Sequence, residues 1–186
     1  MIIDNQDAPA FVARLEGYAS IFEAPDENGD VVARGAFAAG LRAARAGRSV
    51  KMLYQHDAKT PIGRWISLIE DARGLFVSGE IILSSDRARE VYALIDGGAI
   101  DGLSIGFQTV KSTPRPGGRR ILAADLWEIS VVTFPMAPGA RITRLGPPKP
   151  RRPFAAPPDM SPLAPNAPDE AAFSAAVRAA ASVLSA

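Results

Sequence analysis

Gly102-Leu-Ser-Ile-Gly-Phe107 is the stretch that decides how this chain is interpreted. Its serine lies between two glycines in an apolar run, typical of a buried strand that another backbone can approach closely. A second apolar run, Leu126-Trp-Glu-Ile-Ser130, carries a glutamate, and carboxylates are rarely buried without a partner. The single histidine of the chain, His56, is the obvious partner. Ser104, His56 and Glu128 together offer the nucleophile, base and orienting acid of a serine hydrolase.

Each of these residues also has an ordinary structural explanation. A lone histidine at the end of an apolar strand is usually a surface or hydrogen-bonded residue, and a strand serine such as Ser104 usually bonds to backbone. Asp57 follows His56 directly, and neighbours on an extended chain point to opposite faces, so it is a poor orienting acid. Alternation places Glu128 and Asp125 on opposite faces without indicating which face is buried. Asp125 therefore remains a rival for the third role.

The overall composition excludes several classes of protein. The 186 residues are 47% hydrophobic and 22% charged with a net charge of +1, which is ordinary for a soluble domain with an appendage. This balance favours neither a nucleic-acid nor a membrane partner, and no run reaches the roughly 18 apolar residues that span a bilayer. The absence of cysteine excludes thiol catalysis, and one histidine argues against a zinc site. With no signal peptide visible at Met1–Asn5, we expect a cytoplasmic protein without cofactor or metal.

The pattern along the chain predicts three regions: a folded domain over residues 1–146, a proline-rich linker over 147–168 and a short alanine-rich helix or tail over 169–186. Within the first, alternation and turn signals predict many strands and two short helices. This favours a mainly β fold with flanking helices (α+β), namely a closed, mostly antiparallel β-barrel of about six or seven strands. The predicted strands are 11–22, 49–55, 61–70, 74–83, 103–110 and 120–134, and the predicted helices are 37–46 and 86–96.

Seven sequence blocks, spread over about residues 15–145, resemble the prohead proteases of HK97-type tailed phages in content and order. They are Gly17–Phe22, Asp30–Phe37, Met52–Asp57, Pro61–Trp65, Ala88–Leu94, Gly102–Phe107 and Asp125–Met136. These enzymes are similar in turn to the herpesvirus assemblins, which implies an assemblin-like barrel surrounded by helices. The resemblance implies that Ser104 is the nucleophile, His56 the base and Glu128 the orienting acid.

One departure from the family pattern lies after the last block. Many members have an asparagine where this chain has Ala137, in a region that helps to shape the oxyanion site. The assemblin-like enzymes use a loop near here, with a backbone amide and a water held by arginine. Arg141 and Arg144 are both candidates for that arginine, and the sequence does not choose between them.

By this resemblance we expect a serine endopeptidase of capsid maturation. It would cleave the scaffold segment of the major capsid protein, and itself, inside the immature capsid (prohead) in the host cytoplasm, with possible self-association. The particle would be a tailed phage or a phage-derived one such as a gene transfer agent. Two other functions stay open: a non-catalytic capsid-assembly scaffold or chaperone that kept the fold, and a small esterase.

Overall fold

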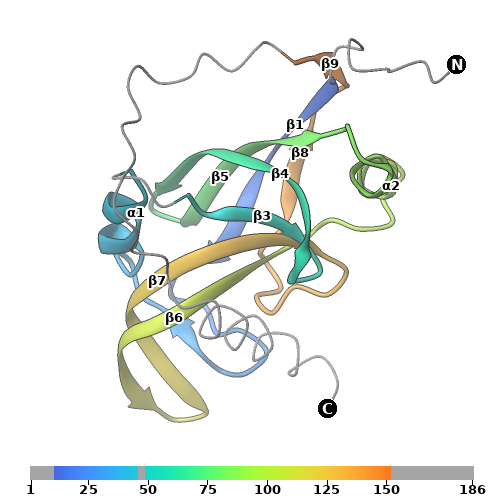
Figure 1. Cartoon of the computed structure of the whole chain (residues 1–186). Coiled ribbons are helices and arrows are strands. Elements are labelled where there is room, and N and C mark those ends of the chain that lie inside the picture. The colour runs from blue at the N-terminus through green and yellow to red at the C-terminus, as the bar shows by residue number, and fades with distance from the viewer. Residues whose placement is uncertain (1–10, 46–48, 152–186) are drawn as a thin grey trace, which may run out of the picture.

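A computed structural model describes residues 11–45 and 49–151 of the chain. This part contains nine strands and two helices (Figure 1). In chain order they are β1 (Phe11–Ile21), β2 (Val31–Val32), α1 (Ala38–Arg45), β3 (Lys51–Tyr54), β4 (Asp57–Glu70), β5 (Gly74–Ile82), α2 (Asp86–Asp96), β6 (Gly102–Arg115), β7 (Gly118–Val132), β8 (Ile142–Leu145) and β9 (Lys149–Pro150).

Local sequence signals account for the helices and for most of the strands. The Ser85 side chain caps α2 by accepting a hydrogen bond from the Ala88 N–H, and Gly97 ends the helix. One face of α2 buries Ala88, Val91 and Ile95, as the 3.6-residue period predicts. The six predicted strands are confirmed, but β4 begins four residues earlier and β6 ends five residues later than predicted, and β2, β8 and β9 were not predicted.

The nine strands form one mixed sheet in the order β2-β7-β3-β4-β5-β1-β8, with β6 paired to β7 and β9 paired to β1. Both β2 and β3 run parallel to β7, and the other ladders are antiparallel. The parallel β3–β7 pair matters most for function, because it places the end of β3 beside the second half of β7.

The prediction of a closed antiparallel barrel of six or seven strands was wrong. The sheet is mixed, has nine strands in the described part of the chain, and is not closed. At the gap, β6 meets the segment before β8 through one isolated bridge, Gly102–Arg141, rather than a ladder. The physical reason is visible in Figure 1: the long β6–β7 hairpin runs away from the other strands, and β8 is only four residues long.

The hydrophobic core lies between the curved sheet and the helices, and α1 packs on β7 while α2 packs on β4 and β5. Its most buried members include Leu15, Met52, Ile81, Leu103 and Ile129. Lys149–Pro150, at the start of the predicted linker, pairs with Phe11–Val12 at the start of β1. Residues 152–186, which hold the rest of the predicted linker and the predicted tail, lie outside the described residues. Neither described helix is long and apolar enough to cross a membrane.

Candidate active site

His56 follows β3 in a sharp left-handed turn. Gln55 and His56 have φ angles of 53° and 57°, a region that costs a non-glycine residue about 1–3 kcal/mol. The turn is held to β7: the Gln55 N–H donates to the Val131 carbonyl at 2.9 Å, and the His56 N–H donates to Ser130 Oγ at 3.1 Å. Because β3 is parallel to β7, this turn brings the imidazole over the second half of β7.

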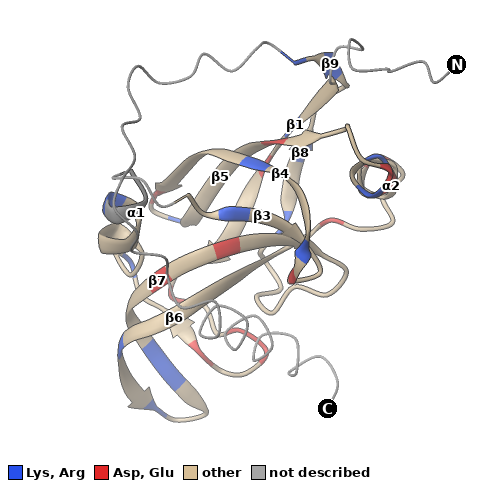
Figure 2. Cartoon of the chain, viewed as in Figure 1, with Lys and Arg blue, Asp and Glu red and all other residues tan. Residues whose placement is uncertain are grey.

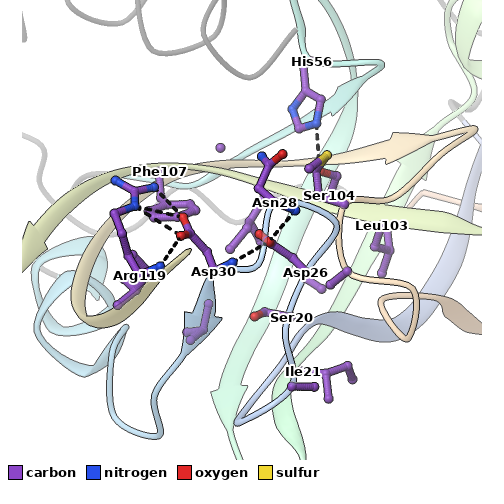
Figure 3. Close-up of a pocket in the computed structure, with 18 residues that line it drawn as sticks. Ser20, Ile21, Asp26, Asn28, Asp30, His56, Leu103, Ser104, Phe107 and Arg119 are labelled. Carbon is purple, nitrogen blue, oxygen red and sulfur yellow. Dashed lines mark hydrogen bonds and ion pairs between the residues drawn. The ribbon is translucent and has the colours of Figure 1, made fainter. Parts of the chain in front are cut away.

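The structure brings the three sequence-predicted site residues together. Ser104 Oγ lies 2.9 Å from His56 Nε2 (Figure 3), and His56 Nδ1 lies 2.6 Å from Glu128 Oε1. The exposed fractions are 5% for Ser104, 3% for His56 and 0% for Glu128. An imidazole that bridges a buried hydroxyl and a buried carboxylate through its two nitrogens can accept the hydroxyl proton while the carboxylate fixes its orientation.

A fourth polar residue, Ser130, completes this network, and the sequence analysis did not identify it. Ser130 is fully buried, and its hydroxyl donates to Glu128 Oε2 at 2.7 Å while accepting the His56 N–H. Both carboxylate oxygens of Glu128 therefore have partners, which lowers the cost of burying the charge. The sequence signal was available, because strand alternation places Ser130 on the same face as Glu128.

The two glycines around Ser104 make room for the site itself. In the β6–β7 ladder Gly106 lies opposite Glu128, and a Cβ at Gly106 would collide with the Glu128 carboxylate. At Gly102 a Cβ would lie 2.6 Å from the Val132 carbonyl oxygen and 2.9 Å from Pro135 Cδ. The expected close approach of another backbone is confirmed at Gly102, where that backbone is Val132, whereas at Gly106 the approaching group is the Glu128 side chain.

The rival acids have other partners. Asp125 accepts a hydrogen bond from Trp127 Nε1 at 3.0 Å and lies opposite Gln108 in the ladder. Asp57 accepts from the Thr60 hydroxyl at 2.5 Å and from the Lys59 N–H at 2.9 Å, and these bonds lower the pKa of the Asp57 carboxyl. Among the described carboxylates, Glu128 is the one that meets the imidazole.

A pocket of about 240 Å³ opens beside Ser104 and His56. The loop between β1 and β2 supplies Asp26, Asn28 and Asp30, and the start of β7 supplies Arg119 (Figure 3). Apolar side chains complete the lining. They include Val32, Leu103, Phe107, Ile121 and Met136.

The residues predicted to shape the oxyanion site differ in whether they line this pocket. Ala137 lines it, whereas neither candidate arginine does. Arg141 Nη1 contacts Asp101 Oδ1 at 2.5 Å and its Nε donates to the Pro138 carbonyl, and Arg144 is 3.8 Å from Glu16. No group of three or more possible metal ligands occurs within residues 11–45 and 49–151.

Comparison with known proteins gives a consistent result. The family model described as Caudovirus prohead serine protease matches residues 2–147. The prohead protease of Enterobacteria phage HK97 is 39% identical over 125 residues, covering 65% of this chain and 55% of that protein. The prohead protease of Escherichia phage T5 is 30% identical over 126 residues, covering 67% and 59%. The chain thus spans little more than half the length of these relatives.

Among solved structures, the bacteriophage T4 capsid assembly protease is similar with a TM-score of 0.54 at 14% identity, covering 66% of this chain and 82% of that one. At this identity the likeness concerns the fold alone. The resemblance stated from the seven sequence blocks is confirmed by the match over residues 2–147. The chain belongs to the family of Caudovirus prohead serine proteases.

Proposed function

We propose that the chain is a serine endopeptidase whose catalytic residues are Ser104, His56 and Glu128. The observation that carries the proposal is the buried chain of contacts from Ser104 Oγ through His56 to Glu128, at 2.9 and 2.6 Å. In the required tautomer His56 Nδ1–H donates to Glu128 and the free Nε2 accepts from Ser104, an assignment made from the partners.

The reaction follows from that tautomer. Ser104 Oγ attacks the scissile carbonyl carbon and its proton passes to His56 Nε2, while Glu128 stabilises the imidazolium. When the tetrahedral intermediate collapses, the C–N bond breaks and His56 returns the proton to the leaving amine. A water molecule then attacks the acyl-serine ester and loses a proton to His56 Nε2. When this second intermediate collapses, the ester C–O bond breaks and Nε2 returns the proton to Ser104 Oγ, which releases the acid product and restores the hydroxyl.

An extended peptide is the substrate form that the site supports best. The Leu103 N–H donates to the Ala140 carbonyl, on the side of β6 that faces away from β7. Backbone N–H and C=O groups alternate between the two edges of a strand. Those of Ile105, two residues after Leu103, therefore also point away from β7, next to Ser104. In the described residues β6 has a ladder only with β7. A substrate strand can therefore add to this edge by backbone hydrogen bonds.

We infer that the natural substrates are the scaffold segment of the major capsid protein and the chain itself, cleaved inside the prohead in the host cytoplasm. Membership of a prohead protease family supports this setting. Residues 1–146 would form the protease domain, and the proline-rich linker (147–168) and tail (169–186) would tether it to scaffold. Tethering would raise the effective concentration of enzyme within a closed shell. The β9 pairing indicates that a shortened chain is best ended after Arg151.

The experiment is to incubate the full chain with the coat protein of its own particle and to determine the coat N-terminus by mass spectrometry. We expect a shortened coat protein with the native chain and full-length coat protein with Ser104→Ala. If the coat protein stays full-length with both the native chain and Ser104→Ala, and particles assemble normally, the scaffold or chaperone function is favoured. Turnover of simple esters without coat cleavage would favour the esterase.

A further inference from the structure

Two of the polar side chains that line the pocket beside Ser104 lack a full set of hydrogen-bond partners in the described part of the chain and have no part in the proposed reaction. They are Ser20, at the end of β1, and Asp26, in the loop between β1 and β2. Figure 3 shows both in the lining of the pocket that also contains Ser104 and His56. A side chain that enters this pocket from a bound peptide would therefore belong to a residue close to the scissile bond.

Ser20 is buried without a partner. Its exposed fraction is 4%, and its hydroxyl has no hydrogen-bond partner among the residues that the structure describes. The β1–β5 register shifts between Tyr18 and Ser20, and Ala19 and Ser20 are consecutive buried residues. Such a bulge redirects a side chain, and bulges are frequent next to active sites. Ser20 is only 4% exposed and its hydroxyl lines the pocket without a partner from the described residues, so a ligand in the pocket can supply the missing hydrogen bond.

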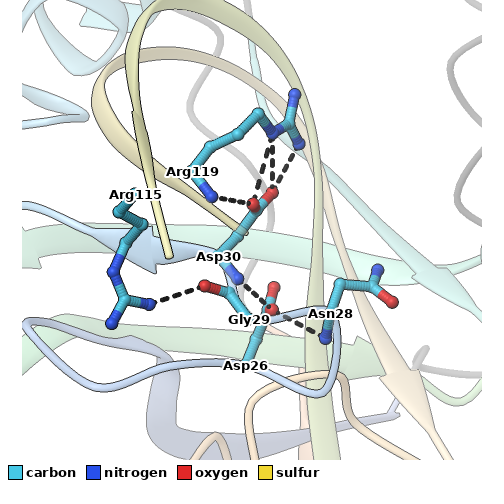
Figure 4. A network of polar contacts seen from close by, with 6 residues as sticks. All are labelled: Asp26, Asn28, Gly29, Asp30, Arg115 and Arg119. Atoms are coloured by element: carbon cyan, nitrogen blue, oxygen red, sulfur yellow. Dashed lines mark hydrogen bonds and ion pairs between the residues drawn. The ribbon is translucent and has the colours of Figure 1, made fainter. Parts of the chain in front are cut away.

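Asp26 has one engaged and one available carboxylate oxygen. Oδ1 accepts the backbone N–H groups of Asn28 at 2.9 Å and Asp30 at 2.8 Å, which shape the loop (Figure 4). Oδ2 has no bond within the described part of the chain. Burial raises the pKa of the Asp26 carboxyl, so the charged form is short of compensating contacts.

The other charges of the pocket neutralise one another. Arg119 is ion-paired with Asp30 through Nη2, and its Nε lies 3.1 Å from Asp30 Oδ2. Arg115 Nη1 also donates to the Gly29 carbonyl at 2.8 Å, so the hairpin tip holds the loop in place. Figure 2 shows the basic residues of this hairpin beside the acidic residues of the loop. Because Arg119 and Asp30 neutralise each other, the charge of Asp26 gives the pocket one uncompensated negative charge.

We infer that this pocket binds a lysine or arginine side chain from one of the two residues that form the scissile bond. The inference rests on the proposed function and specifies its substrate class. Val32, Phe107 and Ile121 provide apolar surface for the long aliphatic stem. The cationic head receives the charge of Asp26 and hydrogen bonds from its N–H groups to Asp26 Oδ2 and Ser20 Oγ, both acceptors.

The test is to digest a proteome-derived peptide library with the full chain and to identify the cut sites by mass spectrometry, with Ser104→Ala as the blank. Selected sites are then made as fluorogenic peptides with lysine, arginine, norleucine or glutamate on either side of the scissile bond. We expect kcat/KM to be at least about tenfold higher for the basic peptides than for the norleucine peptides. Asp26→Asn, which keeps an acceptor for the loop bonds, removes this preference, and Ser20→Ala weakens it.

Glu27→Gln is the matched control, because Glu27 is an exposed acid on the same loop that does not line the pocket. It should keep the preference. The inference would be overturned by cutting without a basic preference, or by a basic preference that is unchanged in Asp26→Asn. A preference for glutamate would also overturn it and would indicate that Arg119 determines what the pocket binds. An absence of all Ser104-dependent cutting would instead contradict the proposed function, and the inference would fall with it.

Discussion

Gly106 lies directly opposite Glu128 in the β6–β7 ladder, and the Glu128 carboxylate occupies the space that a side chain at Gly106 would need. The glycine thus allows a charged group to turn into the sheet interior toward His56. This relationship links the two apolar runs of the sequence: the first needs a glycine at position 106 because the second carries a buried acid opposite it.

Gly106→Ala should therefore greatly lower activity although it replaces none of the three proposed catalytic residues. The new methyl group would push the carboxylate out of line with His56 Nδ1, and misplacements near 1 Å cost about 100-fold in rate. We expect kcat on a cleavable coat peptide to fall by at least about that factor. Gly146→Ala is the control, since a Cβ there would meet only ordinary contacts of 3.5 Å and more. Full activity in Gly106→Ala would show that the position of Glu128 is unimportant.

Glu128→Gln and Asp125→Asn form a matched pair of charge removals, three residues apart on β7. In the serine-protease case loss of the orienting acid lowers kcat about 10⁴-fold, so we expect a loss of that order for Glu128→Gln. Asp125→Asn should change kcat by much less, because its carboxylate bonds Trp127 rather than His56. Steady-state kinetics on the same peptide checks the ranking, and the reverse order would refute the assignment of the acid.

Ser130→Ala should lower kcat and leave KM nearly unchanged, because Ser130 positions Glu128 and the His56 turn without reaching the pocket. We expect a loss of about 10-fold to 100-fold in kcat. Assays are run well below the unfolding temperature, because a buried hydrogen-bond loss also costs about 1–3 kcal/mol of stability. Ser112→Ala, exposed on β6, is the control. A rise in KM with unchanged kcat would exclude the positioning role.

The preference for basic residues should weaken as the pH falls, because protonation of Asp26 removes the charge that attracts them. Burial raises the pKa of Asp26, so the loss begins at a higher pH than for an exposed aspartate. His56, Asp30 and Arg119 also line the pocket, and any effect of pH on the chemical step changes the rate for every peptide. The ratio of kcat/KM for lysine and norleucine peptides cancels that common effect. A ratio that is constant down to the acid limit of activity would contradict the assignment of Asp26.

The sequence was sufficient for features that depend on local patterns. Alternation and turn signals predicted the long strands and the two helices, and chemistry made the single histidine the expected partner of Glu128, with Asp125 left as a rival acid. Ser104 and Glu128 lie on neighbouring strands joined by a short turn, so their proximity follows from one hairpin. His56 reaches them through the parallel β3–β7 pairing, and no local pattern reveals a parallel pair far apart in sequence.

The incorrect predictions concern interactions between distant segments. Barrel closure requires a ladder between β6 and the segment before β8, and only the Gly102–Arg141 bridge forms. The short strands β2 and β9, of two residues each, carry no periodic signal. Close approach of another backbone to these glycines was predicted, but the sequence does not indicate that the group approaching Gly106 is the Glu128 side chain.

The central claim, that Ser104 is a nucleophile activated by His56, is tested most directly by covalent labelling. The full chain is treated with a fluorophosphonate, and the modified peptide is identified by mass spectrometry. The account predicts one phosphonyl group per chain, attached to Ser104, with no adduct in Ser104→Ala and labelling slowed by orders of magnitude in His56→Ala. Labelling of another residue, or equally fast labelling of Ser104 in His56→Ala, would contradict it.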